Sequence, residues 1–155
     1  MIITPVHWYQ APGVLKLMMD RLVCADGGNS DPTTTHGKDA ELAKRLEQDW
    51  QYPRHLKDRV FAVVVHGDST GAETLRRMLT DWLTDMHLRP AGDKGLIDRY
   101  IGYYKPYESS HDDLSDDTSV WAEVRNAALT LREAVARYRA GERASGAQLV
   151  EPRTK

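Results

Sequence analysis

Near the middle of the chain runs Val60-Phe61-Ala62-Val63-Val64-Val65, followed at once by His66-Gly67-Asp68-Ser69-Thr70-Gly71. The first part is apolar and mostly β-branched with no polar alternation, which is typical of a strand buried on both faces of a parallel sheet. After the glycine turn, one face of a helix is indicated by the spacing of Leu75, Leu79, Trp82, Leu83 and Met86. A strand, a glycine turn and a helix in this order indicate an α/β layer fold.

Towards the N-terminus, the pattern predicts one further strand and two further helices. Met1-Ile2-Ile3-Thr4 reads as the end of a strand that Pro5 stops. Residues 14–23 form a helix that is apolar almost all round, so we expect it to be buried or to lie at a subunit interface. Residues 25–37 read as a loop, and residues 38–50 as a second amphipathic helix.

Towards the C-terminus, Tyr100-Ile101-Gly102-Tyr103-Tyr104 is the candidate for the last strand. A final helix is expected to begin at Asp116-Asp117-Thr118, whose side chains are good N-caps. We expect residues 1–140 to form one domain and residues 141–155 a loose tail. The apolar side chains that the final helix is expected to bury are Val120, Val124, Ala128, Leu131, Val135 and Tyr138.

Composition narrows the class of protein. The chain has 155 residues, of which 41% are hydrophobic, and a net charge of -2. The near-neutral charge argues against binding nucleic acid or an anionic membrane by charge alone. No apolar run approaches the length of a membrane span, no signal peptide is visible, and the single cysteine, Cys24, cannot form an internal disulfide. We expect a cytoplasmic, soluble protein.

Two segments follow predicted strands and have the composition of ligand loops. The first, Thr4-Pro5-Val6-His7-Trp8-Tyr9-Gln10-Ala11-Pro12-Gly13, offers two adjacent aromatic rings for stacking. The second, His66-Gly67-Asp68-Ser69-Thr70-Gly71, leads into a helix whose free N–H groups favour negative charge. Because ligands of open parallel sheets bind at the carboxyl ends of the strands, the two loops together predict a site for a flat, electron-accepting ring.

The same segments resemble a known family, the flavodoxin-like NAD(P)H-dependent FMN and quinone reductases. Thr4-Pro5-Val6-His7-Trp8-Tyr9, with Lys16 and Asp20-Arg21 behind it, looks like the third-strand loop and the following helix of that family. The segment from Val63 to Glu73 is similar to the fourth-strand loop. Asp98-Arg99-Tyr100-Ile101-Gly102-Tyr103-Tyr104 resembles the tyrosine-rich end of one subgroup.

The resemblance implies a doubly wound parallel sheet flanked by helices, with FMN as cofactor. It implies a two-electron hydride transfer from NAD(P)H to a quinone or a similar small-molecule acceptor, with no catalytic side chain and no metal. By position, the flavin-contacting residues would be Pro5, Val6, His7, Trp8, Tyr9 and Gln10 in the first loop and His66, Gly67, Asp68, Ser69 and Gly71 in the second.

The chain departs from the family at its start, which corresponds to the end of the third strand. We therefore expect a flavodoxin-like fold truncated to roughly its last three strands, without the N-terminal half and its phosphate-binding loop. Each charge-assisted hydrogen bond of such a loop is worth about 1.5–3 kcal/mol, so we expect weak FMN retention or none. Without the missing strands, one edge of the first strand has no partner. We therefore expect that this edge is paired in a homo-oligomer or covered by a loop.

Two other functions stay open. Gly67-Asp68-Ser69-Thr70-Gly71 matches the nucleophile-elbow pattern Gly-x-Ser-x-Gly, so a serine hydrolase using Ser69 is an alternative, with His87 or His111 as its base. The broad apolar helix over residues 14–23 favours a non-catalytic interaction module. The six histidines lack metal-ligand spacing, and no metal site is expected.

Overall fold

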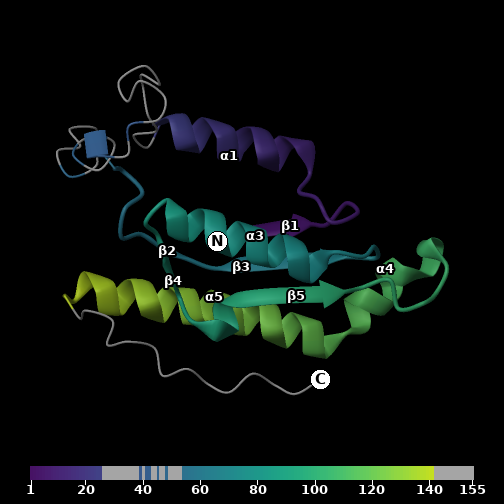
Figure 1. The fold of residues 1–155 in the computed structure, drawn as a ribbon. Helices are drawn as coiled ribbons and strands as arrows, with labels where there is room; N and C mark the ends of the chain where they lie inside the picture. Colours follow the sequence, from purple (N-terminus) through teal and green to yellow (C-terminus); the bar gives the residue numbers. More distant parts are fainter. Residues whose placement is uncertain (26–38, 40, 43–44, 46–47, 49–53, 142–155) are drawn as a thin grey trace.

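The computed structural model describes residues 1–25, 39, 41–42, 45, 48 and 54–141 (Figure 1). Its centre is a parallel sheet of three strands in the order β1-β3-β5, where β1 is Ile2–Pro5, β3 is Val63–Gly67 and β5 is Leu96–Tyr100. A short parallel pair joins β2 (Val60–Phe61) to β4 (Arg89–Pro90). The expected α/β fold with a parallel sheet flanked by helices is confirmed.

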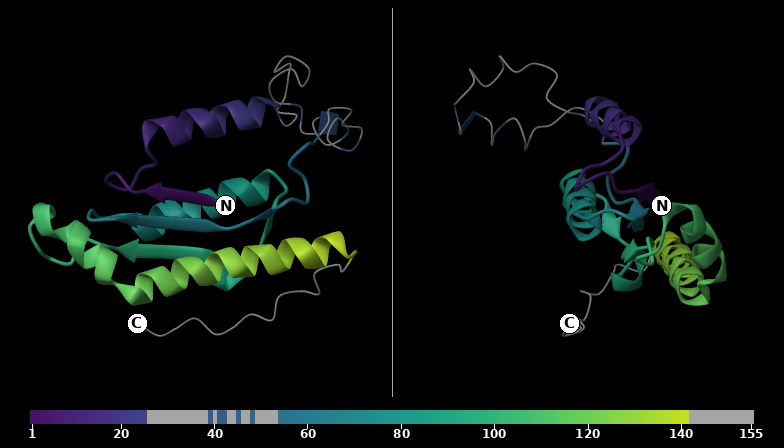
Figure 2. Two further views of the ribbon diagram at one scale, coloured as in Figure 1. Left: turned by 180° about the vertical axis from the view of Figure 1, so that it is seen from behind. Right: turned by 90° about the vertical axis from the view of Figure 1, so that its right-hand side faces the viewer.

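Helices cover the two faces of the sheet, as the side view in Figure 2 shows. Helices α1 (Gly13–Ala25) and α3 (Ala72–Asp85) lie on one side, and α5 (Thr118–Arg139) lies on the other. A 3-10 turn (Asp93–Gly95) precedes β5, and α4 (Tyr107–Asp116) connects β5 to α5. No helix in the described part of the chain is long and apolar enough to cross a membrane.

The central strand β3 is buried on both faces, as its sequence predicts. Val63 and Val65 pack with Leu75 and Leu79 of α3, and all four side chains are fully buried. On the opposite face, Val64 packs with Ile97 of β5 and Ala127 of α5. Burial of each such side chain contributes about 1.5–3 kcal/mol, so the two clusters fix both helical layers to the sheet.

The three strands end side by side, which brings their loops together. Pro5 of β1 pairs with His66 of β3, and His66 pairs with Arg99 of β5. All three arrows in Figure 1 point the same way, towards α4. The loops after β1, β3 and β5 therefore share one end of the sheet, where ligands of parallel sheets bind.

The last strand and the final helix agree only in part with the sequence predictions. Asp117 is the N-cap of α5 and accepts hydrogen bonds from the backbone nitrogens of Ser119 and Val120, which confirms the expected start of the final helix. The last strand is Leu96–Tyr100 rather than residues 100–104, because the chain turns after Tyr100. In α5, Ala127 is buried, whereas Ala128 and Tyr138, both expected to be buried, are exposed.

Helix α1 is less buried than its composition suggests. Met19 is buried in the core, but Val14 is 81% exposed and Leu17 is 65% exposed. Of the predicted helix over residues 38–50, the structure describes only residues 39, 41, 42, 45 and 48, and the last four are helical. The predicted loop over residues 25–37 lies outside the described residues from residue 26. The predicted tail lies outside them from residue 142, as does the side chain of Cys24.

Candidate functional site

The two predicted loops lie against each other. The backbone N–H of Val6 donates to the carbonyl of His66 at 2.8 Å, and that of Tyr9 donates to the carbonyl of Thr70 at 3.1 Å. The first bond continues the β1–β3 ladder and the second extends it into the loops. The expected juxtaposition of these loops is confirmed, while ligand binding there stays a prediction.

Ser69 fastens the two loops together. Its hydroxyl donates to the carbonyl of Val6 at 3.1 Å and accepts a longer bond, 3.5 Å, from the backbone N–H of Trp8. A serine nucleophile would instead donate its proton to a base. In this geometry Ser69 holds the first loop in place, and nothing in it favours the hydrolase alternative.

The space beside the two glycines of the second loop is filled by residues of the first loop. A Cβ on Gly67 would lie 2.7 Å from Cγ1 of Val6. A Cβ on Gly71 would lie 2.6 Å from the backbone nitrogen of Tyr9, and the φ of Gly71 is +105°. Both glycines are therefore required for the close packing of the first loop on the second.

Aromatic residues with positive φ gather at this end of the sheet. Trp8 and Tyr9 have φ of 46° and 67°, and Tyr103 and Tyr104, in the loop after β5, have φ of 51° and 55°. Positive φ is strained for bulky residues, and such strain concentrates at functional sites. Three of these side chains are exposed, Trp8 by 75%, Tyr9 by 50% and Tyr104 by 94%, whereas Tyr103 is partly buried. Sequence reasoning identified the first pair as ring-binding residues and read the second pair as part of a strand.

The loop after β5 joins the other two. The backbone N–H of Ile101 donates to the carbonyl of Gly67 at 2.9 Å, which holds this third loop beside the second. The rings of Tyr100 and Tyr104 are tilted against each other with their centroids 5.1 Å apart. Because β3 is the central strand, its loop lies between the two aromatic loops.

Backbone donors are available in this middle loop. Within the described part of the chain, the N–H groups of Asp68, Ser69 and Thr70 have no hydrogen-bond partner. Helix α3 follows directly, with Gly71 as its N-cap and no side chain capping it. Unpaired N–H groups at a strand–helix turn create a positive potential that suits an anionic or carbonyl-rich ligand.

The other residues predicted to contact the flavin differ in the exposure of their side chains. Val6 is 3% exposed and belongs to the core, so its side chain is not available at the surface. Pro5 and Asp68 are exposed. His7 and Gln10 are also exposed, and their backbones exchange two hydrogen bonds of 3.0 and 3.1 Å that close the first loop into a tight turn.

His66 is the histidine of the second loop. It is the one partly buried residue of β3, and it pairs with Pro5 and Arg99 in the sheet register. Burial lowers the pKa of its imidazole below the usual 6.5, because the charged form is poorly solvated there. A neutral imidazole at this position can accept or donate a hydrogen bond without carrying charge.

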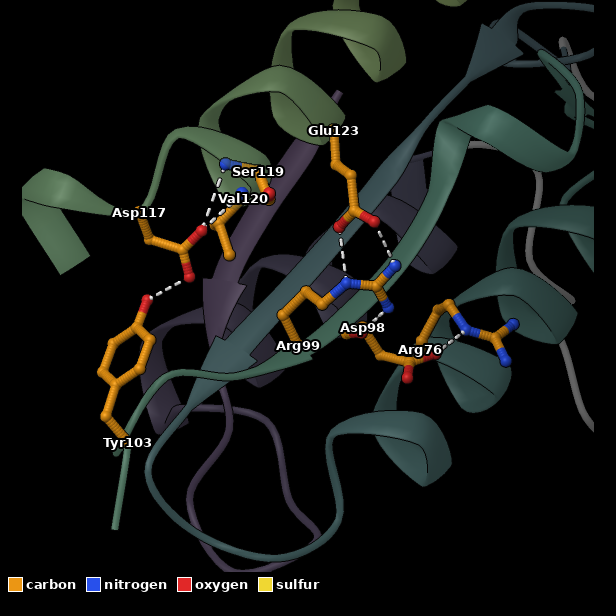
Figure 3. A network of polar contacts seen from close by, with 8 residues as sticks. All are labelled: Arg76, Asp98, Arg99, Tyr103, Asp117, Ser119, Val120 and Glu123. Carbon is orange, nitrogen blue, oxygen red and sulfur yellow. Dashed lines mark hydrogen bonds and ion pairs between the residues drawn. The ribbon is translucent and has the colours of Figure 1, made fainter. Parts of the chain in front are cut away.

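Ion pairs from consecutive residues of β5 reach both helical layers (Figure 3). Asp98 accepts from Nε of Arg76 in α3 at 2.5 Å. Arg99 donates from Nε and Nη2 to both carboxylate oxygens of Glu123 in α5, each at 2.5 Å. Hydrogen bonding to Glu123 is the main reason that the pKa of Arg99 is raised. Sequence reasoning missed these pairs, although strand alternation places Asp98 and Arg99 on opposite faces.

A third polar contact fixes the loop after β5. The hydroxyl of Tyr103 donates to Asp117 at 2.8 Å, on the carboxylate that caps α5 (Figure 3). Burial, and then this hydrogen bond, raise the pKa of Tyr103 to about 12. The backbone N–H of Val120, and then the Tyr103 hydroxyl, lower the pKa of Asp117. The cap and the phenol thus hold the aromatic loop against the start of α5.

Among the residues that the structure describes, no three or more His, Cys, Asp or Glu side chains are grouped so that they could hold a metal ion. A hollow of about 620 Å³ lies between α1 and α3, lined by side chains such as Lys16, Met19 and Trp82 and by no residue of the predicted site.

Comparison with known proteins gives no relative. No protein-family model matches the chain, and neither a curated protein nor a solved structure is detectably similar to it.

Proposed function

We propose that this chain is a flavodoxin-like, FMN-dependent NAD(P)H oxidoreductase whose flavin lies against the loops that follow β1, β3 and β5. One observation carries the proposal. Exposed aromatic side chains stand on the two outer loops, Trp8 and Tyr9 on one and Tyr104 on the other, and the middle loop carries backbone N–H groups without partners in the described part of the chain.

These features fit the two chemical demands of a flavin ring. Its flat faces need aromatic or apolar surface, which Trp8 and Tyr104 offer at low conformational cost. Its carbonyl edge needs hydrogen-bond donors, which the amides of Asp68, Ser69 and Thr70 offer before the start of α3. When bound, FMN would accept a hydride from NAD(P)H and pass two electrons to a quinone or a similar small molecule.

In this proposal, the residues of the chain bind the flavin and orient it. The bonds from Ser69 to Val6 and from Tyr9 to Thr70 hold the first two loops at a fixed separation. The Tyr103–Asp117 contact holds the third. Loops that are held in place beforehand lose less entropy when a ring binds against them, and the strained backbone at the aromatic residues would serve this purpose.

The test is titration of the purified chain with FMN up to about 1 mM, well above micromolar. We expect a rise in melting temperature, a perturbed flavin absorbance band and quenching of tryptophan fluorescence. NAD(P)H consumption with a quinone should then depend on added FMN. An unchanged melting temperature together with an unchanged flavin spectrum over this range would overturn the proposal.

A matched pair of variants locates the binding. Tyr104→Ala removes an exposed ring from the proposed site, and Tyr138→Ala removes an exposed ring near the end of α5, at the opposite end of the sheet. We expect FMN to bind about three- to tenfold more weakly to the first variant and unchanged to the second. Equal binding to both variants and to the wild type would place the flavin elsewhere.

A second candidate is a non-catalytic interaction module. The observation that favours it is the exposure of apolar side chains on α1, with Val14 at 81% and Leu17 at 65%. Self-association that Leu17→Glu abolishes, combined with no response to FMN, would select this candidate over the oxidoreductase.

A further inference from the structure

A groove runs along α5 beside the first residues of the chain, on the sheet face opposite α3. Its volume is about 420 Å³. One wall is a single stripe of α5, whose members are spaced three or four residues apart, and Met1 forms the other side. The lining residues of α5 are Ala128, Leu131, Arg132, Val135, Ala136 and Arg139.

The edge strand β1, which begins beside this groove, is largely exposed on this face. Helix α5 packs on Val64 and Ile97, which belong to β3 and β5, and so it leaves β1 bare on this face. Strand alternation turns Ile2 and Val6 towards α1 and α3, where both join the core, and turns Met1 and Ile3 towards the α5 side. Ile3 is 58% exposed and Met1 44%, an apolar strand surface that layered folds normally cover.

The groove is also positively charged. The last eleven residues of α5 contain three arginines, Arg132, Arg137 and Arg139, and one acidic residue, Glu133. Within the described part of the chain, neither Arg132 nor Arg139 makes an ion pair. The two lining arginines are seven residues apart, or about 10 Å along the helix, with the apolar stripe between them. An occupant with matching chemistry is apolar in its centre and acidic at positions two turns apart.

We propose that this groove docks an amphipathic helix of a partner protein, whose apolar side chains lie on Leu131 and Val135 and whose Asp or Glu residues pair with Arg132 and Arg139. The small residues Ala128 and Ala136, two turns apart, let a helix backbone approach α5 closely. The stripe from residue 128 to residue 139 is about 16 Å long, which matches three turns of a partner helix. Helix-in-groove recognition uses this combination of an apolar stripe and flanking charge.

The test uses a fluorescent designed peptide that forms an amphipathic helix with leucines on one face and glutamates at its borders, followed by fluorescence anisotropy. Ala128→Glu blocks the groove, and Ala122→Glu makes the same change on an exposed part of α5 outside it. We expect the first variant to weaken binding by about tenfold or more and the second by less than about twofold. Circular dichroism and melting temperature confirm that both variants are folded.

Charge reversal tests the second half of the proposal. Arg132→Glu combined with Arg139→Glu should weaken binding of the acidic peptide by about tenfold at low salt, with a smaller effect at high salt. Arg125→Glu, on the same helix but outside the groove, is the control. Reversal of the peptide charges from glutamate to lysine should restore binding to the doubly reversed variant and lose it to the wild type.

Three results would overturn the proposal. The first is equal binding of acidic and basic peptides to the wild type, which would make the surface unselective. The second is self-association in sedimentation that Ala128→Glu abolishes, which would assign the groove to a second copy of the chain. The third is binding to anionic lipid vesicles that competes with the peptide, which would assign it to a membrane surface. None of these results depends on FMN, so the docking site and the proposed oxidoreductase are tested independently.

Discussion

Gly71 and Tyr9 pack so closely that no side chain fits between them, since a Cβ on Gly71 would lie 2.6 Å from the backbone nitrogen of Tyr9. The φ of Gly71, +105°, is also unfavourable for any residue with a Cβ. Gly71→Ala should therefore lower the free energy of unfolding by about 2 kcal/mol or more, and it should displace the first loop from the second. Urea unfolding measures the first effect, and near-UV circular dichroism of Trp8 and Tyr9 reports the second.

Gly13 provides the matched control. It begins α1, and a Cβ there would meet nothing within 4 Å. Gly13→Ala should be neutral or stabilising by up to about 1 kcal/mol, because it reduces only the freedom of the unfolded chain. If both alanine variants had the same stability, the close packing of Gly71 on Tyr9 would be contradicted.

The features that the sequence predicted correctly are local ones. The run of valines in β3 needs only its own composition to indicate a strand buried on both faces, and β3 is buried in that way. Asp117 caps α5 through its own side chain two and three residues along the chain. The meeting of the loops after β1 and β3 follows from parallel pairing, which the strand–turn–helix order already implied.

The features that the sequence did not predict depend on partners far along the chain. Tyr100–Tyr104 has strand propensity, yet Tyr103 turns out of the sheet and bonds to Asp117, a contact that no local pattern reveals. The polar segment before Asp117 forms α4, although it lacks a wide apolar stripe. The glycines of the second loop look like ligand-approach positions in sequence, but only the structure shows that Val6 and Tyr9 fill the space.

The Arg99–Glu123 pair should show measurable coupling. Both side chains are partly exposed, 42% and 36%, so solvent screening limits the interaction, but its two parallel hydrogen bonds favour it over an ordinary surface pair. A double-mutant cycle with Arg99→Gln and Glu123→Gln should give a coupling energy of about 1 kcal/mol. The same cycle on Lys16 and Asp20, an exposed pair one turn apart on α1, should give about 0.3–0.5 kcal/mol. Equal coupling in the two cycles would mean that the bidentate geometry adds nothing.

Tyr103 should ionise only in strongly alkaline solution. Its pKa of about 12, against 10.0 for an ordinary phenol, means that the unfolded chain releases this proton before the folded chain does. The stabilisation is therefore complete below pH 10 and is lost as the pH rises towards 12. Ultraviolet difference titration of the wild type and of Tyr103→Phe isolates this phenol. Asp117→Asn should bring its ionisation closer to pH 10, and a titration unaffected by that substitution would remove Asp117 as a cause.

His66 should make the protein less stable in mild acid. Because burial lowers the pKa of its imidazole below 6.5, the unfolded chain binds a proton more readily than the folded chain does. The stability that His66 supports is present above about pH 6.5 and is lost as the pH falls from there towards the pKa of the folded state. Urea unfolding between about pH 8 and pH 5 should give a smaller loss for His66→Gln than for the wild type, and His55→Gln, at an exposed position outside the sheet, is the matched control. Proton NMR of the imidazole gives the pKa directly, and a midpoint at or above 6.5 would contradict the burial argument even if the variant proved too unstable to measure.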